Sequence, residues 1–229
     1  MSGSLLTDTS VRTDAVLASV TKHKGMVTVR FNQSLPPVGP VMRLYPQTAG
    51  GVCNALCNKW IAEHANDRSL WSWLAPTGTV DLGSFSSLMM QFMDKRIPWQ
   101  EKRLAYLRMY GVIERRDTAN SSLSSGYDLG DKKIPSAHVG RDMAMAMTYG
   151  GLKNSSGSYR AISLWGKGGI GHAVCAWVAN DACFFDPNYG EFYFGNVKDF
   201  ATWAAEFGQV SGYGAMFGGV WVRDFAKRI

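Results

Sequence analysis

The order of the hydrophobic periodicities along the chain limits the folds open to this sequence more than any other feature. From residue 52 to residue 147, apolar side chains recur at helical spacing in four segments, which begin near Val52, Ser84, Pro98 and Ser136. Beyond residue 158, the pattern changes to short runs rich in β-branched and aromatic residues, separated by turns. Helices and strands that are segregated in this way predict an α+β fold and not an alternating α/β fold.

The predicted strands are short, and one of them precedes the helical region. They are expected at Met26–Phe31, Tyr159–Trp165, His172–Val178, Ala182–Phe185, Glu191–Phe194 and Gly219–Phe225, with one further helix over Val197–Phe207. The sequence contains no internal repeat and no linker between domains.

The composition is that of one globular domain. The chain has 229 residues, of which 46% are hydrophobic and 18% are charged, which suffices for a core of its own. The net charge of +6 is spread over short basic pairs, and none of them forms a stripe interleaved with aromatic residues or belongs to a nucleic-acid motif. We therefore expect a mildly basic, solvated surface and no nucleic-acid partner.

Residues 1–24 are rich in Ser, Thr and small residues, and they lack a firm periodicity and the apolar segment of a signal peptide. We interpret them as a flexible leader that precedes a single domain over residues 25–229. No run approaches the ~18–20 apolar residues of a transmembrane helix, so only peripheral contact with a membrane fits the sequence. The four cysteines are expected to be free thiols in a reducing compartment.

Cys53 has the surroundings of a reactive thiol. It follows two glycines at residues 50–51 and lies at the predicted start of a helix, where the partial positive charge of the helix N-terminus lowers a thiol pKa. Cys57, one turn further along, is expected to be a buried structural thiol. Gln47 lies six residues before Cys53 and could donate its amide to a developing oxyanion together with the Cys53 N–H, as acyl-transfer chemistry requires.

His172 and Asp186 are the residues expected to serve this thiol. His172 enters a strand after a glycine-rich turn, and Asp186 closes the next predicted strand. The turn Asn180-Asp181 joins the two strands, so antiparallel pairing could place the imidazole and the carboxylate side by side. Thiol catalysis needs such a base and such an orienting group.

Three sequence blocks resemble the YopT/AvrPphB family of papain-like cysteine proteases, which bacteria deliver into host cells. The blocks are residues 51–56 (GVCNAL) with Trp60-Ile61, residues 171–173 (GHA) and residues 185–192 (FDPNYGEF), and they occur in the family's order. The third block is the most specific of the three.

The resemblance implies a papain-like α+β fold, in which a helical lobe carries Cys53 and an antiparallel sheet lobe carries His172 and Asp186. It implies that these residues form a Cys-His-Asp triad that needs no cofactor, and the wider papain-like pattern assigns Gln47 to the oxyanion hole. It also implies a monomer that cleaves a host protein through an acyl-enzyme. Such a protein would be secreted by a non-Sec bacterial system, with its signal in residues 1–24, and would act in the host cytoplasm or at a host membrane.

Several alternative hypotheses use the same residues. The same triad could pass its acyl group to an amine or attack a side-chain amide, as an acyltransferase, transglutaminase or deamidase does. A protease fold could also serve as a non-catalytic interaction module, although no triad position is lost. A zinc site on Cys53, Cys57, His172 and Cys175 is disfavoured, because a strand points His172 and Cys175 to opposite faces. A Gly-x-Gly-x-x-Gly match at residues 166–171 precedes a strand instead of the helix that a dinucleotide site needs.

Overall fold

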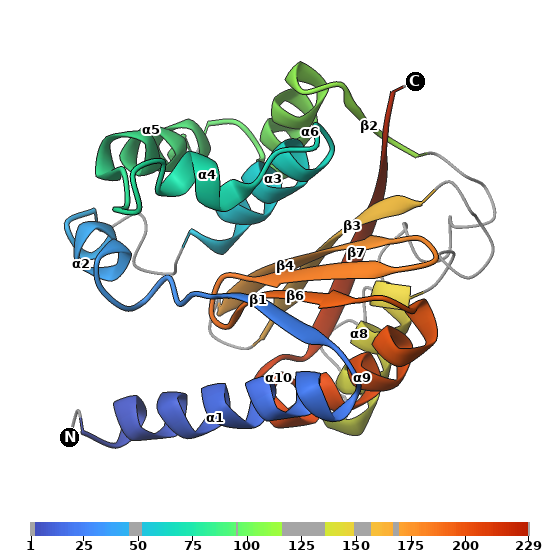
Figure 1. Ribbon diagram of the computed structural model, residues 1–229. Coiled ribbons are helices and arrows are strands. Elements are labelled where there is room, and N and C mark those ends of the chain that lie inside the picture. Colours follow the sequence, from blue (N-terminus) through green and yellow to red (C-terminus); the bar gives the residue numbers. More distant parts are fainter. Residues whose placement is uncertain are drawn as a thin grey trace.

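An antiparallel sheet lies at the centre of the molecule (Figure 1). The computed structural model describes residues 3–45, 52–94, 96–115, 136–148, 157–166 and 170–228. Within these ranges the sheet has seven strands in the order β1-β6-β5-β4-β3-β7-β2, and each neighbouring pair is antiparallel. The strands are β1 (Met26–Arg30), β2 (Val112–Glu114), β3 (Ser158–Trp165), β4 (Gly171–Val178), β5 (Ala182–Asp186), β6 (Gly190–Phe194) and β7 (Gly219–Lys227).

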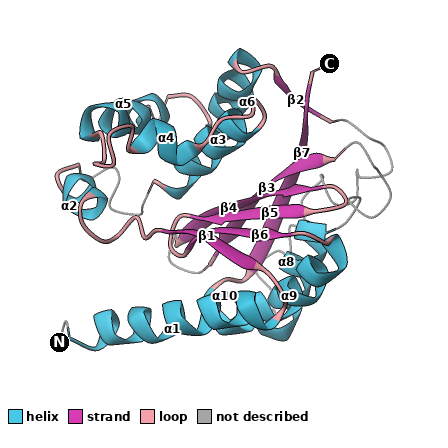
Figure 2. Cartoon of the chain, viewed as in Figure 1, coloured by secondary structure: helices cyan, strands magenta, loops and turns pink. Residues whose placement is uncertain are grey.

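Helices cover both faces of this sheet (Figure 2). One face carries α2 (Val38–Arg43), α3 (Cys53–His64), α4 (Leu70–Leu74), α5 (Leu82–Met93) and α6 (Trp99–Met109). The opposite face carries α1 (Gly3–Lys22), α8 (Ser136–Thr148), α9 (Val197–Val210) and α10 (Tyr213–Met216). The predicted mixture of helices with an antiparallel sheet is therefore confirmed.

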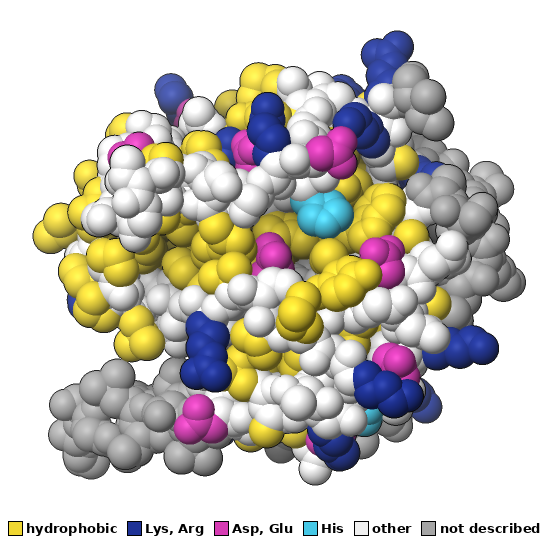
Figure 3. Space-filling view, in the orientation of Figure 1, with side chains coloured by type: hydrophobic (Ala, Val, Ile, Leu, Met, Phe, Trp, Pro, Cys, Tyr) yellow, Lys and Arg dark blue, Asp and Glu magenta, His cyan; other side chains and the backbone are white. Residues whose placement is uncertain are grey.

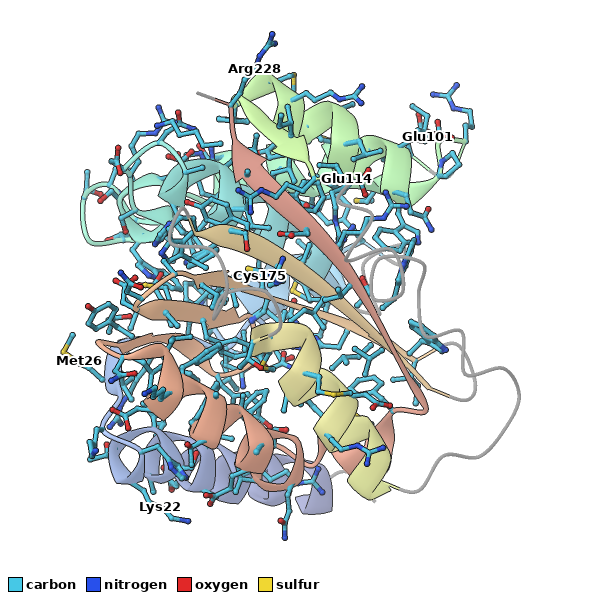
Figure 4. All side chains as sticks on the ribbon, turned by 90° about the vertical axis from the view of Figure 1, so that its right-hand side faces the viewer. Lys22, Met26, Glu101, Glu114, Cys175 and Arg228 are labelled. Atoms are coloured by element: carbon cyan, nitrogen blue, oxygen red, sulfur yellow. The ribbon has the colours of Figure 1, made fainter. Side chains whose placement is uncertain are left out.

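Strand β4 is buried on both faces and contributes to two hydrophobic clusters. Its residues Val174, Ala176 and Val178 belong to the cluster with α1, α8 and α9, whereas Ala173 and Cys175 belong to the cluster with α3. This division follows from the alternation of side chains along a strand. In the side view, Cys175 lies near the centre of the molecule at the level of the sheet (Figure 4). The central position fixes β4, whose second residue is His172.

The N-terminal segment differs from the flexible leader that the sequence predicts for residues 1–24. Residues 3–22 form the helix α1, and Val16, Leu17 and Val20 are buried in the cluster that also holds the aromatic side chains of α9. The Ser19 hydroxyl accepts a hydrogen bond from Trp203 Nε1 at 3.0 Å. Between Leu6 and Ala15 every residue except Val11 is polar, which interrupts the helical periodicity of the segment.

The other predicted elements match the structure to within a few residues, with one difference at the start of α5. Asp81, and not Ser84, caps this helix, because its carboxylate accepts from the N–H groups of Gly83 and Ser84. The sequence-based prediction misses α2, α4, α10 and β2, which have too few residues to establish a periodicity. Among the described residues, no helix is both long enough and apolar enough to cross a membrane.

Candidate active site

Cys53 is the first residue of α3, at the end of the helix that approaches β4. Its side chain is buried, with 8% of the residue exposed. The first hydrogen bond of the helix runs from Leu56 N–H to Val52 O at 3.0 Å, so the N–H groups of residues 53–55 have no carbonyl partner within the helix. These amides give the thiol a partly positive surrounding and supply the Cys53 N–H as a donor for an oxyanion.

His172 and Asp186 are brought together by the pairing of β4 with β5. Cys175 lies opposite Phe185 in this antiparallel pair, and His172 and Asp186 follow toward the same end of the sheet. His172 Nε2 lies 2.8 Å from Asp186 Oδ1, and both side chains are buried. Because Nε2 is occupied by Asp186, Nδ1 is the ring nitrogen available for the hydrogen bond between His172 and the Cys53 thiol.

The electrostatic interactions of the pair favour a thiolate and an imidazolium. Burial alone raises the pKa of Cys53, but the His172 charge, the His172 hydrogen bond and the backbone amides of Ala173 and Asn54 together lower it below its usual value. Burial alone lowers the pKa of His172, whereas Asp186 and Cys53 raise it well above its usual value. A thiol with a lowered pKa beside a cationic histidine is the activated nucleophile of cysteine hydrolases.

The Asp186 carboxylate is fully buried and accepts three hydrogen bonds. Besides His172, Asp186 Oδ1 accepts from the Asn188 N–H at 2.8 Å, and Oδ2 accepts from the Tyr213 hydroxyl at 3.0 Å. Burial, followed by the Asp186 charge, raises the pKa of Tyr213 well above its usual value, so this hydroxyl keeps its proton and remains a donor. The Tyr213 ring also lies 5.1 Å from the His172 ring, between centroids, and restricts its tilt.

Gln33 connects the segment before Cys53 with the segment after Asp186. Its Oε1 accepts from Val52 N–H at 3.0 Å, and its Nε2 donates to Asn188 Oδ1 at 2.9 Å. Its backbone N–H donates to Pro187 O at 2.7 Å. Gln47, the residue predicted for the oxyanion hole, lies in residues 46–51, outside the described part of the chain.

Arg103 of α6 supports the residue that follows the cysteine. Its Nη2 donates to Asn54 Oδ1 at 2.5 Å, and its guanidinium lies 4.7 Å from the centre of the Trp99 ring. Arg103 is 1% exposed, and burial lowers its pKa to about 10, which leaves a cation at neutral pH. A buried positive charge thus lies on the helical side of the site.

Cys57 and Cys183 differ from Cys53 in their surroundings. Cys57 is buried, donates to Ala173 O at 3.3 Å, and has its pKa raised well above the usual value by burial and by Cys175. Cys183 is partly buried, and burial together with Glu191 and Asp181 raises its pKa to about 12. Across the described ranges, no three His, Cys, Asp or Glu side chains are grouped as a metal site requires.

The molecular surface seen in Figure 3 has no continuous basic stripe. Lys and Arg side chains are dispersed over this face and alternate with Asp and Glu, whereas hydrophobic side chains gather between the helices above and the sheet below. Several large apolar residues are exposed on and beside α2 and α5, namely Leu35, Leu44, Leu82 and Met90. The surface on and beside α2 and α5 therefore carries exposed apolar side chains.

A protein-family model matches the two parts of the chain that hold these residues. The peptidase C58 model, described as Yersinia/Haemophilus virulence surface antigen, matches residues 18–94 and 134–217, which hold Cys53, His172 and Asp186. The chain belongs to the C58 peptidase family. This result confirms the resemblance to YopT and AvrPphB that the sequence blocks indicate.

Curated relatives in the C58 family include Yersinia proteases. The cysteine protease yopT1 of Yersinia enterocolitica serotype O:8 is 29% identical over 205 residues, which are 85% of this chain and 61% of the relative. The protein adenylyltransferase and cysteine protease IbpA of Histophilus somni is 30% identical over 223 residues, which are 87% of this chain and 5% of IbpA. This C58 chain thus spans about three fifths of the length of the YopT proteins that it matches.

A solved structure with the same fold is the Pseudomonas avirulence protein AvrPphB. It superposes on this C58 chain with a TM-score of 0.51 at 14% sequence identity, and the match covers 80% of this chain and 95% of AvrPphB. At this identity the comparison concerns the fold alone.

Two residues of the C58 site were missed in the sequence. Tyr213 lies 27 residues after Asp186, to which it donates. Gln33 lies 19 residues before Val52, from which it accepts. Neither stands in a motif, and each acts through a contact made only in the folded chain. A polar residue that precedes an extended connector, as Gln33 does, was the available signal, and it is a weak one.

Proposed function

We propose that this chain is a cysteine endopeptidase in which Cys53 is the nucleophile, His172 the general base and acid, and Asp186 the group that orients His172. The observation that carries the proposal is the chain of contacts from the Cys53 thiol to His172 and on to Asp186, with Cys53 at a helix start. Membership of the C58 family and the naming of its Yersinia relatives as cysteine proteases support the same activity.

The residues have the following roles in the proposed reaction. The Cys53 thiolate attacks the substrate carbonyl carbon, and the Cys53 N–H and the Gln47 amide stabilise the oxyanion. His172 then gives its proton to the leaving amine, which leaves an acyl-enzyme. His172 next takes a proton from water, whose oxygen attacks the thioester and releases the acid and free Cys53. Asp186 holds the ring and stabilises the imidazolium throughout.

We further propose that the substrate is a host protein and that the chain acts inside host cells after bacterial secretion. N-terminal labelling of a host lysate tests both the activity and the substrate. Wild type and the control variant Cys183→Ala should produce the same new N-termini, and Cys53→Ala should produce none. Full activity of Cys53→Ala would refute the proposal. A gain of mass on a target without new N-termini would instead assign the triad to acyl transfer.

Gln47 can be tested separately from the nucleophile. Removing one oxyanion donor typically slows acyl-enzyme formation by about 10²–10³-fold. Gln47→Ala should therefore slow proteolysis to that extent while the alkylation of Cys53 by iodoacetamide is unchanged, because alkylation forms no oxyanion. Equal loss of both reactions would place Gln47 in the support of Cys53 and not in the oxyanion hole.

A further inference from the structure

A set of hydrogen bonds outside the triad closes a ring around the site. Starting at Asp186 Oδ2, the ring passes to the Tyr213 hydroxyl at 3.0 Å and from there to Asn188 Nδ2 at 3.0 Å. It continues from Asn188 Oδ1 to Gln33 Nε2 at 2.9 Å, and from Gln33 Oε1 to Val52 N at 3.0 Å. Val52 precedes Cys53, so the ring returns to Asp186 through the triad itself.

The direction of every bond in this ring is determined by its two ends. A carboxylate oxygen can only accept a hydrogen bond, and a backbone N–H can only donate one. The Tyr213 hydroxyl must therefore donate to Asp186 and accept from Asn188 Nδ2. Asn188 Oδ1 is then left to accept from Gln33 Nε2, and Gln33 Oε1 is left to accept from Val52 N–H. Each group meets a partner of the required kind, with Gln33 linking the two halves of the ring.

Gln33 is suited to this task by its burial and its backbone. The residue is 4% exposed, and its N–H donates to Pro187 O at 2.7 Å, which fixes it to the turn after Asp186. Val52 carries no side-chain cap for α3, so Gln33 is what holds the Val52 N–H at the helix start. A buried amide with both polar atoms bonded has few alternative positions.

We propose that Gln33 is a positioning residue that fixes the start of α3, and hence Cys53, relative to the turn that carries Asp186. The inference rests on the proposed function, since it assumes that Cys53, His172 and Asp186 form the reacting set. Gln33 is assigned no contact with the substrate carbonyl, because it is 4% exposed and its Oε1 and Nε2 both bond within the protein.

The test is the pH dependence of Cys53 alkylation by iodoacetamide, followed by peptide mass spectrometry. This reaction needs no protein substrate, because the thiolate sulfur displaces iodide from a small reagent. Gln33→Leu keeps the side-chain volume but removes both hydrogen bonds. It should move the midpoint of the profile up by about one pH unit and slow Cys53 alkylation on the acid side of that midpoint by up to about tenfold. Gln91→Leu, the same change at an exposed site on α5, should match wild type.

Asn188→Ala removes the same hydrogen bond by deleting its acceptor. Because Asn188 is partly exposed, this variant should fold even where Gln33→Leu does not. It should move the profile in the same direction. The double variant should be no slower than the slower single variant, because the two side chains share one path. Multiplicative rate losses in the double variant, or an unchanged profile in a folded single variant, would overturn the proposal.

The same experiment separates this inference from the proposed function. A wild-type Cys53 that reacts no faster than Cys183 would show that no activated thiol exists, and both would fail together. A reactive wild-type Cys53 with an unchanged Gln33→Leu profile would remove only the role of Gln33. Far-UV circular dichroism and a cooperative melting curve establish that each variant is folded.

Discussion

Asp186→Asn changes the charge of the site with the smallest change of shape. Asp186 Oδ1 accepts from His172 and from the Asn188 N–H, both at 2.8 Å, and the amide oxygen of asparagine can take over both bonds. The new NH₂ group then faces the Tyr213 hydroxyl, which in the wild-type protein donates to Asp186 Oδ2 at 3.0 Å. The Tyr213 proton loses its acceptor in a buried place, and His172 loses the charge that stabilises its cation.

The size of the effect follows from the loss of a charge-assisted hydrogen bond. Such a bond to a buried charged group contributes about 1.5–3 kcal/mol, and about 1.4 kcal/mol corresponds to a factor of ten. The loss acts on the imidazolium and thereby on the thiolate that pairs with it. Asp186→Asn should therefore reduce the reactive Cys53 thiolate at neutral pH by about 10- to 150-fold.

The assay is Cys53 alkylation as a function of pH, with Asp14→Asn on the exposed side of α1 as the matched control. In Asp186→Asn the midpoint of the profile should move to higher pH, whereas Asp14→Asn should leave it in place. If the profile of a folded Asp186→Asn superposes on that of wild type, the carboxylate does not support the imidazolium, and the role assigned to Asp186 is refuted.

Three further predictions concern the pH dependence, the first helix and a partly buried glutamate. Peptidase activity should depend on pH as a bell-shaped curve. It should be lost as the pH falls through the lowered pKa of Cys53, because the thiolate becomes protonated, and as the pH rises through the raised pKa of His172, because the imidazolium loses its proton. A profile that is flat across both limbs would contradict the ion pair. Val20→Asp places a carboxylate in the core beneath α9. It should destabilise the fold by about 4 kcal/mol or more, measured as a lower midpoint of unfolding in urea. A flexible leader would tolerate the same change. Glu191→Leu removes the carboxylate oxygen that accepts from both Trp60 and Trp71, at 2.7 and 3.2 Å. It should cost about 1–3 kcal/mol by the same measurement, and no change would show that the two indoles do not depend on this acceptor.

Local patterns in the sequence were sufficient to predict much of this fold. The strand sequences from Ser158 to Phe194 are short runs rich in apolar, β-branched and aromatic residues, and their pairing follows from short turns that leave little choice of register. The start of helix α3 was predicted to within one residue, because the glycines before Cys53 interrupt the apolar pattern. The candidate residues Cys53, His172 and Asp186 were found for the same reason, since each stands in a short motif.

What could not be predicted depends on contacts between distant segments. Residues 3–22 have too few apolar positions to indicate a helix, and Val16 and Val20 become core residues only because α9 offers an aromatic surface. Gln33 and Tyr213 are ordinary polar residues of a connector and a short helix until the fold aligns them with Asn188. Hydrogen bonds between side chains that are 25 to 155 residues apart leave no periodic pattern in one sequence.

The candidate site lies where the two hydrophobic clusters of the molecule meet, and this position explains why so many bonds surround it. Cys53 belongs to the cluster beneath α3, whereas Tyr213 and Phe217, which flank His172, belong to the cluster on the other face of the sheet. Packing fixes each cluster separately, but packing alone leaves small relative shifts between them. A thiol and an imidazole that must stay within hydrogen-bond distance cannot tolerate such shifts. The ring through Gln33, Asn188 and Tyr213 ties both clusters to the turn after Asp186, and directional bonds thereby supply the alignment that nondirectional packing does not.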